Sequence, residues 1–184
     1  VVKSSAAFDP EKLMSYQSHW MAELSHEDRA DQCLPFLQKA GLLSDSPSDA
    51  ERSLVTRVVT ALDDRIKVAG DILTYDYFFK ADIEFSEKDF KKRVSRSGVP
   101  ELLTEFRAVL AGHDGWSAES LEAALQSFVE SKEVGAGLLI HALRIAATGS
   151  AIGPGVYDCL VLVGRETVLS RIDLALAMAA ESSE

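Results

Sequence analysis

The chain has 184 residues, enough to bury a core and to form one domain or two small ones. Its composition, 47% hydrophobic and 26% charged, is that of a globular protein, and its apolar runs are too short to span a bilayer. The net charge of −10 excludes a protein whose whole surface binds nucleic acid, because such surfaces need many cations to contact phosphates. The first ten residues lack the apolar stretch of a signal peptide and an initiator methionine. We therefore expect a segment of a longer chain with no membrane association.

The cysteines and histidines do not form a metal-binding pattern. Cys33 and Cys159 stand alone, without Cys-x-x-Cys spacing, and the four histidines are scattered along the chain. Lone thiols are typical of a reducing compartment. The sequence therefore predicts a cytoplasmic protein with no metal site.

Helical periodicity runs through nearly the whole chain, and no strand-length alternation of polar and apolar residues occurs. The predicted helices cover residues 8–24, 26–41, 47–72, 86–98, 99–112, 117–129, 137–148, 155–164 and 165–180. Start and stop signals support them: Asp9 and Ser117 as N-caps, Ser48 with Glu51 as a capping box, and Gly41 after the second helix. The sequence predicts an all-α array of about ten helices.

One basic run stands out in this acidic chain. The stretch KDFKKRVSR contains Lys88, Lys91, Lys92, Arg93 and Arg96, and reads as a short helix. It follows a segment, FFKADIEFSEKD, that interrupts the helical pattern and predicts a boundary between subdomains near residues 80–86.

No set of residues identifies a catalytic centre. Asp63 with Asp64, and Asp82 with Glu84, are acidic pairs, but neighbouring carboxylates on a helix point in different directions. Nothing marks a nucleophile, so we predict no catalytic residue in this chain.

The stretch TGSAIGPGVYDCL, residues 148–160, is a glycine-rich turn between two apolar helices. It lacks the lysine of a phosphate-binding P-loop and does not follow a strand, as a dinucleotide fingerprint would. Gly149 suits a left-handed helix end, and Pro154 is expected to set the first turn of the next helix. Free N–H groups there suit an anion or a base edge, and Arg144 lies one turn upstream. A simple corner with a surface arginine is the alternative interpretation.

The order of motifs resembles the C-terminal half of bacterial-type glutamyl-tRNA synthetases, over essentially the whole chain. The motifs are KSSAAFDPEKL, DYFFKADIEF, GWSAESLEAAL and LRIAATGSAIGPGVYDCLVLVGRETVLSRIDLAL. The last is the most specific, with Arg144, Thr148-Gly149-Ser150, Pro154-Gly155 and Gly164-Arg165-Glu166. The chain departs from the family at Gln17, at Ala136 and at His141-Ala142-Leu143, where Gln-Pro-Leu is common.

The resemblance implies a function and a set of site residues. It implies an anticodon-binding helical cage of a class I aminoacyl-tRNA synthetase, with residues 1–24 ending the stem-contact region and two anticodon-binding subdomains at 25–85 and 86–184. The implied contacts to the first two anticodon bases are Arg144, Gly153, Pro154, Gly155 and Val156. The implied contact to the third base is Arg65. The candidate phosphate contacts are Lys91, Lys92 and Arg96. We expect a positive strip that joins these arginines and lysines.

The implied partners are the anticodon loop of the tRNA for glutamate and an upstream catalytic domain of the same chain. That domain would attach glutamate to tRNA with ATP and magnesium, while this segment would need no cofactor. An arginine at position 65 implies preference for the glutamate tRNA over the glutamine tRNA. The alternative hypothesis, suggested by the −10 charge, is a helical protein-interaction or regulatory module that has lost RNA binding.

Overall fold

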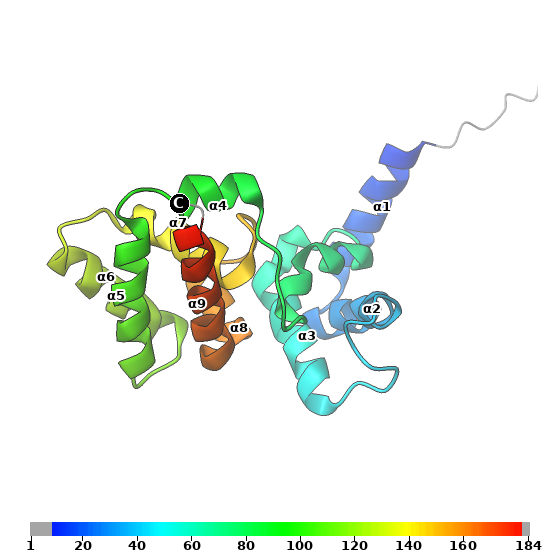
Figure 1. The fold of residues 1–184 in the computed structure, drawn as a ribbon. Helices are drawn as coiled ribbons and strands as arrows, with labels where there is room; N and C mark the ends of the chain where they lie inside the picture. Colours follow the sequence, from blue (N-terminus) through cyan, green and yellow to red (C-terminus); the bar gives the residue numbers. More distant parts are fainter. Residues whose placement is uncertain (1–8, 182–184) are drawn as a thin grey trace, which may run out of the picture. The chain divides into compact units, whose positions relative to one another are not determined.

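The computed structural model describes residues 9–181. Among these residues there is no strand, so the predicted all-α class is confirmed (Figure 1). The α-helices are α1 (Pro10–Glu23), α2 (His26–Lys39), α3 (Asp49–Leu62), α4 (Glu87–Arg93), α5 (Val99–Gly112), α6 (Ala118–Ser131), α7 (Ala136–Thr148), α8 (Val156–Val163) and α9 (Arg165–Glu181). Two 3₁₀ helices, η1 (Asp63–Arg65) and η2 (Ala69–Phe78), follow α3. The beginning of the first family motif, residues 3–8, lies outside the described part of the chain.

The chain divides into two compact units, residues 1–76 (unit 1) and 77–184 (unit 2). The predicted boundary between residues 85 and 86 lies later than this division. Residues 77–86 belong to unit 2 because their backbone is bonded there: Arg171 Nη2 donates to the carbonyl oxygens of Tyr77 and Lys80, at 3.0 and 2.6 Å. The division of the chain into three subdomains stays a prediction.

The helix signals act as expected from the sequence. Asp9 caps α1 by accepting from the backbone N–H groups of the first turn, and Ser48 and Glu51 form both halves of a capping box at α3. Gly41, with φ 70°, ends α2, and Ser117 is the N-cap of α6. These local patterns need only a few neighbouring residues, which is why the sequence predicts them well.

The predicted helix over residues 47–72 is wrong in its second half. Helix α3 ends at Leu62, and Asp63 takes φ 45°, a conformation that no α-helix continues. The buried side chain of Arg29 donates to the carbonyl and carboxylate oxygens of Asp63, both at 3.5 Å. The same guanidinium donates to the backbone of Ala22 at 2.9 Å, near the end of α1. A contact from a distant residue therefore stops this helix, and local periodicity gives no sign of it.

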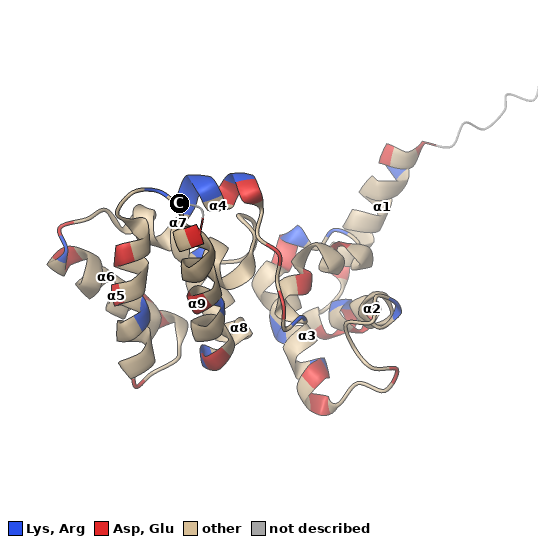
Figure 2. Ribbon diagram, in the orientation of Figure 1, with Lys and Arg blue, Asp and Glu red and all other residues tan. Residues whose placement is uncertain are grey.

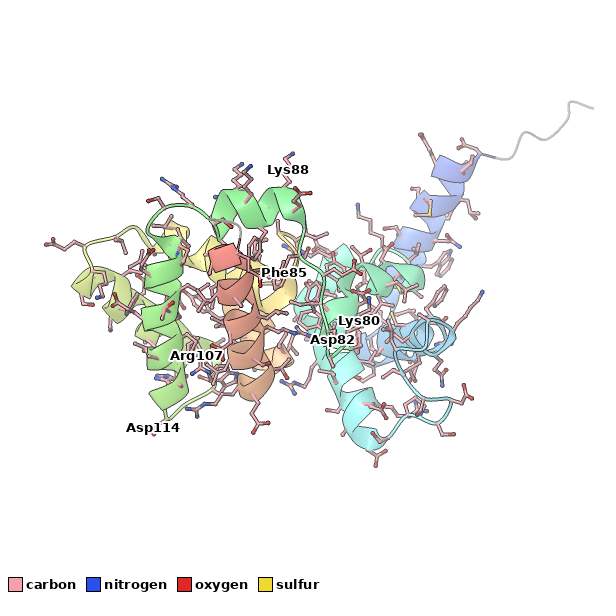
Figure 3. The ribbon with its side chains drawn as sticks, in the orientation of Figure 1. Lys80, Asp82, Phe85, Lys88, Arg107 and Asp114 are labelled. Atoms are coloured by element: carbon pink, nitrogen blue, oxygen red, sulfur yellow. The ribbon has the colours of Figure 1, made fainter. Side chains whose placement is uncertain are left out.

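Unit 2 is organised around one apolar cluster. Helices α4 to α9 all contribute to it, with Phe106, Leu139 and Leu143 among its fully buried side chains. Helices α5 and α9 run side by side (Figure 1). Arg107, labelled in Figure 3, joins them through two hydrogen bonds to the carboxylate of Asp173, at 2.9 and 2.7 Å.

Arg171 is the main polar group inside unit 2. It is 4% exposed, and its two terminal nitrogens reach three carbonyl oxygens: those of Ala147, near the end of α7, and of Tyr77 and Lys80. Burial lowers the pKa of this guanidinium, with the charge of Asp82 acting in the opposite direction. Figure 3 shows Lys80 and Asp82 on the segment that leads into α4. Arg171 therefore fastens this segment to the end of α7.

We predict that Arg171→Met lowers the free energy of unfolding of unit 2 by about 2–4 kcal/mol, because it leaves buried carbonyl oxygens without donors. Chemical denaturation followed by circular dichroism measures the change. The exposed Arg96 provides the control, and Arg96→Met should change stability by less than about 0.5 kcal/mol. Equal effects of the two substitutions would contradict this role of Arg171.

Candidate nucleic-acid interface

The glycine-rich turn joins α7 to α8 and lies against the segment before α4. Gly149 ends α7 with φ 71°, and its carbonyl accepts from the N–H of Ser86 at 3.2 Å. A Cβ at Gly149 would collide with the carbonyl oxygen of Glu84. Only glycine therefore allows both the left-handed helix end and this close backbone approach.

Hydroxyl groups hold the first half of the turn. Thr148, 2% exposed, donates through Oγ1 to the carbonyl of Arg144 at 2.8 Å and accepts from the N–H of Ser150 at 3.2 Å. The hydroxyl of Ser150 in turn accepts from the N–H of Ile152 at 3.2 Å. Side chains that bond their own backbone in this way fix a turn without help from a ligand.

Arg144 is half-buried and is part of the turn. Its Nη1 donates to the carbonyl oxygen of Pro154 at 2.7 Å and lies 3.6 Å from the sulfur of Cys159. Its other N–H donors form no hydrogen bond within the described residues. Arg144 is thus a structural part of the corner, and whether the turn also binds a ligand stays a prediction. One nitrogen holds the turn, and the rest of the planar guanidinium can meet a ligand.

The remaining predicted residues of the turn differ in exposure. Pro154 and Val156 are buried, Val156 in the apolar cluster, whereas Gly155 is exposed. Helix α8 begins at Val156 with Gly155 as its N-cap, so the expectation that Pro154 sets the first helical turn is wrong. Pro154 precedes the N-cap by one residue, and its carbonyl oxygen accepts a hydrogen bond from Arg144. Of these three residues, only Gly155 is exposed to solvent.

The start of α8 already has a carboxylate. A Cβ at Gly155 would lie 2.6 Å from Oδ2 of Asp158, so the missing side chain makes room for this group. The sequence analysis expected a helix start that suits an anion, but an exposed carboxylate beside it disfavours phosphate. The carboxylate of Asp158 can accept hydrogen bonds from amino groups, such as those of nucleobases. The sequence signal was an aspartate in the first turn of the helix.

Tyr77 is a second residue that the sequence analysis missed. It is buried, and its hydroxyl donates to the carbonyl oxygen of Ile152 at 3.2 Å. A Cβ at Gly153, where φ is 153°, would meet this hydroxyl and lie 3.3 Å from Nη1 of Arg144. Tyr77 and Arg144 thus both approach the space that a side chain at Gly153 would fill.

The basic residues lie on and just after α4. Lys91 and Lys92 are exposed in its last turn, and Arg96 is exposed beyond its end. Figure 2 shows the positive residues at the end of α4 and the two acidic residues at its beginning. Helix α4 packs against α7, which bears Arg144. The positive strip that would join these residues to Arg144 stays a prediction.

Arg65 belongs to unit 1 and is described separately. It ends η1 and does not continue α3. Its side chain is 50% exposed, and Nη1 lies 3.7 Å from the carboxylate of Asp64, itself 90% exposed. Such an exposed pair stabilises the fold by less than about 1 kcal/mol, which leaves the guanidinium available to a ligand.

In residues 9–181, no group of three or more His, Cys, Asp or Glu side chains is placed to hold a metal ion, and none of the helices is long and apolar enough to cross a membrane. An open hollow of about 620 Å³ in unit 2 is lined by Val109, His113 and small residues of α6. Another of about 530 Å³ in unit 1 is lined by Trp20, Phe36 and their neighbours. Neither hollow contains a predicted site residue.

Comparison with known protein families gives the identity of this fold. A family model described as an anticodon binding domain matches residues 28–176, most of the chain. The chain belongs to the anticodon-binding domain family. The matched residues include the turn and span from α2 into α9.

Known relatives of the anticodon-binding domain are glutamate–tRNA ligases. The chain is 35% identical to the enzyme of Moorella thermoacetica over 176 residues and 32% identical to that of Desulforudis audaxviator over 182 residues. These matches cover 95% and 96% of the chain but 36% of each relative, so the chain spans about a third of their length. A crystal structure of a glutamate tRNA ligase from Elizabethkingia meningosepticum matches 96% of the chain and 34% of that protein, with a TM-score of 0.81 and 25% identity.

We predict that Gly153→Ala destabilises unit 2 by about 2 kcal/mol, because the new methyl group displaces the Tyr77 hydroxyl and meets an unfavourable φ. In a Tyr77→Phe background the same substitution should cost at least 0.5 kcal/mol less, a coupling of about the size seen between contacting residues. Thermal unfolding of the two single variants and the double variant gives this difference. Additive effects would show that Tyr77 and Gly153 do not constrain each other.

Proposed function

We propose that this chain binds the anticodon loop of the tRNA for glutamate, as the anticodon-binding part of a glutamate–tRNA ligase. The observation that carries the proposal is the turn after α7, which is fixed by its own hydrogen bonds and presents free Arg144 donors beside exposed Gly155. A site that is ordered before the ligand arrives loses little entropy on binding. The family membership and the glutamate–tRNA ligase relatives support this ligand.

The chemistry of the turn suits unpaired bases better than phosphates. Arg144 supplies donors, Asp158 supplies an acceptor, and Gly155 lets a base approach the backbone without meeting a side chain. Sequence-specific reading of RNA takes place mostly in single-stranded loops, where base edges are free to form hydrogen bonds. A mixed set of donors and acceptors distinguishes bases, whereas cations alone do not.

Phosphate binding and the chemical reaction would involve residues outside this turn. Lys91, Lys92 and Arg96 would contact RNA phosphates, and the catalytic domain of the parent protein would supply the chemistry that uses ATP and magnesium. The whole protein would act in the cytoplasm. This assignment agrees with the net charge of −10, because a domain that reads a few bases needs few cations of its own.

We predict that the chain binds a glutamate tRNA transcript at about 50 mM salt and binds transcripts with changed anticodons at least tenfold more weakly. Filter binding measures both, and low salt is used because phosphate contacts weaken as salt is added. Arg144→Ala should cost about 1–3 kcal/mol of binding, the size of a base-edge contact.

Arg144 also holds the turn, so the variant needs a matched control. Tyr77→Phe removes another hydrogen bond to the same turn and leaves every donor of Arg144 in place. It should lower the melting temperature while changing RNA affinity much less than Arg144→Ala. Equal losses of affinity in the two variants, or binding that ignores the anticodon, would contradict base reading by Arg144. If the unaltered chain does not bind RNA at all, the result would favour a protein-interaction module.

Arg65 is proposed to read the third anticodon base. Codons for glutamate and glutamine differ at their first letter, so this anticodon base is C in one tRNA and G in the other. Guanidinium donors suit the O2 and N3 acceptors of cytosine, whereas the pairing edge of guanine presents N–H donors at N1 and N2. The exposed, weakly paired Arg65 therefore favours the glutamate tRNA and disfavours the glutamine tRNA.

We predict that Arg65→Gln reduces the preference for the glutamate tRNA by about tenfold, or about 1.4 kcal/mol, because an amide both donates and accepts. Charging of the two tRNAs by the parent enzyme, with and without the substitution, measures the ratio. Arg57→Gln, an exposed arginine on α3, is the control and should leave the ratio unchanged. If the Arg65 variant charges the two tRNAs in the same ratio as the unaltered enzyme, Arg65 does not select between them and only forms its ion pair with Asp64.

A further inference from the structure

His141 lies on the exposed face of α7, three residues before Arg144 and therefore on the same side of the helix. Its imidazole is exposed, and the charges of nearby basic residues of unit 2 act on it. Nothing in the anticodon-reading role described above uses it.

The register of two helices places His141 beside the basic end of α4. The hydrogen bond from Ser86, the N-cap of α4, to the carbonyl of Gly149 joins the start of α4 to the end of α7. Helix α4, which begins at this bond, packs against α7. Arg93 is seven residues from Ser86, a rise of about 10 Å, and His141 is eight residues from Gly149, a rise of about 12 Å. The end of α4 is therefore long enough to come near His141, and the charges of Arg93 and Lys92 act on its imidazole.

The charges that act on His141 are all positive. The charges of Arg93 and Lys92, on α4, and of Arg144, on the same helix as His141, act on the imidazole electrostatically. Desolvation and these three cations hold the pKa of His141 below its usual value, so the free protein keeps the imidazole neutral near pH 7. No acidic residue lies between Lys91 and Pro100, and the nearest acids along the chain are Glu87 and Asp89 in the first turn of α4, four residues before Lys91 and Arg93.

We propose that His141, Lys92, Arg93 and Arg144 together bind an RNA phosphate, and that His141 takes up a proton when the phosphate arrives. A phosphate placed among the four groups cancels the repulsion between the cations and the imidazolium, so the charged imidazole becomes favourable. The bound complex then holds one more proton than the free protein. This inference rests on the proposed RNA-binding function and adds a proton-linked phosphate contact to it.

The sign of the pH dependence follows from this proton. Binding that takes up a proton becomes tighter as the pH falls from the pKa of the bound histidine to that of the free one, by at most about tenfold per pH unit. At a pH below both values, and at a pH above both, His141 adds no pH dependence. The acidic side chains of the chain keep their charge through most of this window, since their usual pKa values are about 4.

The test measures Kd for a glutamate tRNA transcript from pH 5.5 to 8.0 at constant low ionic strength. The unaltered chain should bind several-fold more tightly at the acid end, and His141→Gln, which cannot be protonated, should lose most of this dependence. His19→Gln, at an exposed histidine of unit 1, is the control and should keep it. Proton NMR of the His141 ring gives a second readout, with the expected rise of its pKa on addition of RNA.

The outcomes separate this inference from the proposed function. Loss of pH dependence in His141→Gln, together with binding that ignores the anticodon, would support the proton-linked contact and contradict base reading. Anticodon-specific binding with the same pH dependence in both proteins, or a His141 pKa that RNA leaves unchanged, would overturn the proton-linked contact alone. Absence of tRNA binding even at about 50 mM salt would overturn both.

Discussion

The close approach of two backbones at Gly149 is the constraint on which the rest of the candidate site depends. The carbonyl of Glu84 occupies the position where any other residue would have its Cβ, and Ser86 donates to the carbonyl of Gly149. This contact fixes where α4 begins relative to the end of α7. It therefore sets the level of Arg93 along α7, while Arg171 holds residues 77–80 against the same helix end. A single missing side chain thus links the turn to the basic helix.

The polar groups of unit 2 divide into two sets with different chemistry. At the end of α7, Arg144, Asp158 and the glycine backbone offer donors and an acceptor with almost no net charge, which suits a neutral base. At the end of α4, Lys92 and Arg93 add positive charge close enough to act on His141, which suits a phosphate. Arg144 lies between the sets and contributes to both. An RNA strand that places a base in the turn would bring its own backbone toward the basic helix, so the two sets fit one ligand.

Sequence patterns predicted the structural features that depend on adjacent residues and missed those that depend on residues far away in the sequence. The capping box at Ser48 and the helix end at Gly41 need a few adjacent residues, and both were predicted correctly. The end of α3 was missed because it depends on Arg29, which is far from Asp63 in the sequence. Tyr77 was missed for the same reason, since its hydroxyl meets Ile152 only after unit 2 has folded. Arg144 was found through its place in a motif, but no pattern showed that Pro154 would bind one of its nitrogens.

The acidic composition and the basic cluster are compatible because charge acts locally in salt solution. At physiological ionic strength the Debye length is about 8 Å, so exposed acids more than about one helix diameter away contribute little to the potential at α4. The four cations from Lys91 to Arg96 then decide what this surface attracts, whatever the total charge of −10. The remaining acidic surface has its own effect, because it repels RNA that is not correctly placed. Under the proposed function, a small basic cluster on an acidic domain would give less affinity than a uniformly basic surface, but it would confine RNA to the face where Arg144 and the turn are proposed to read a base.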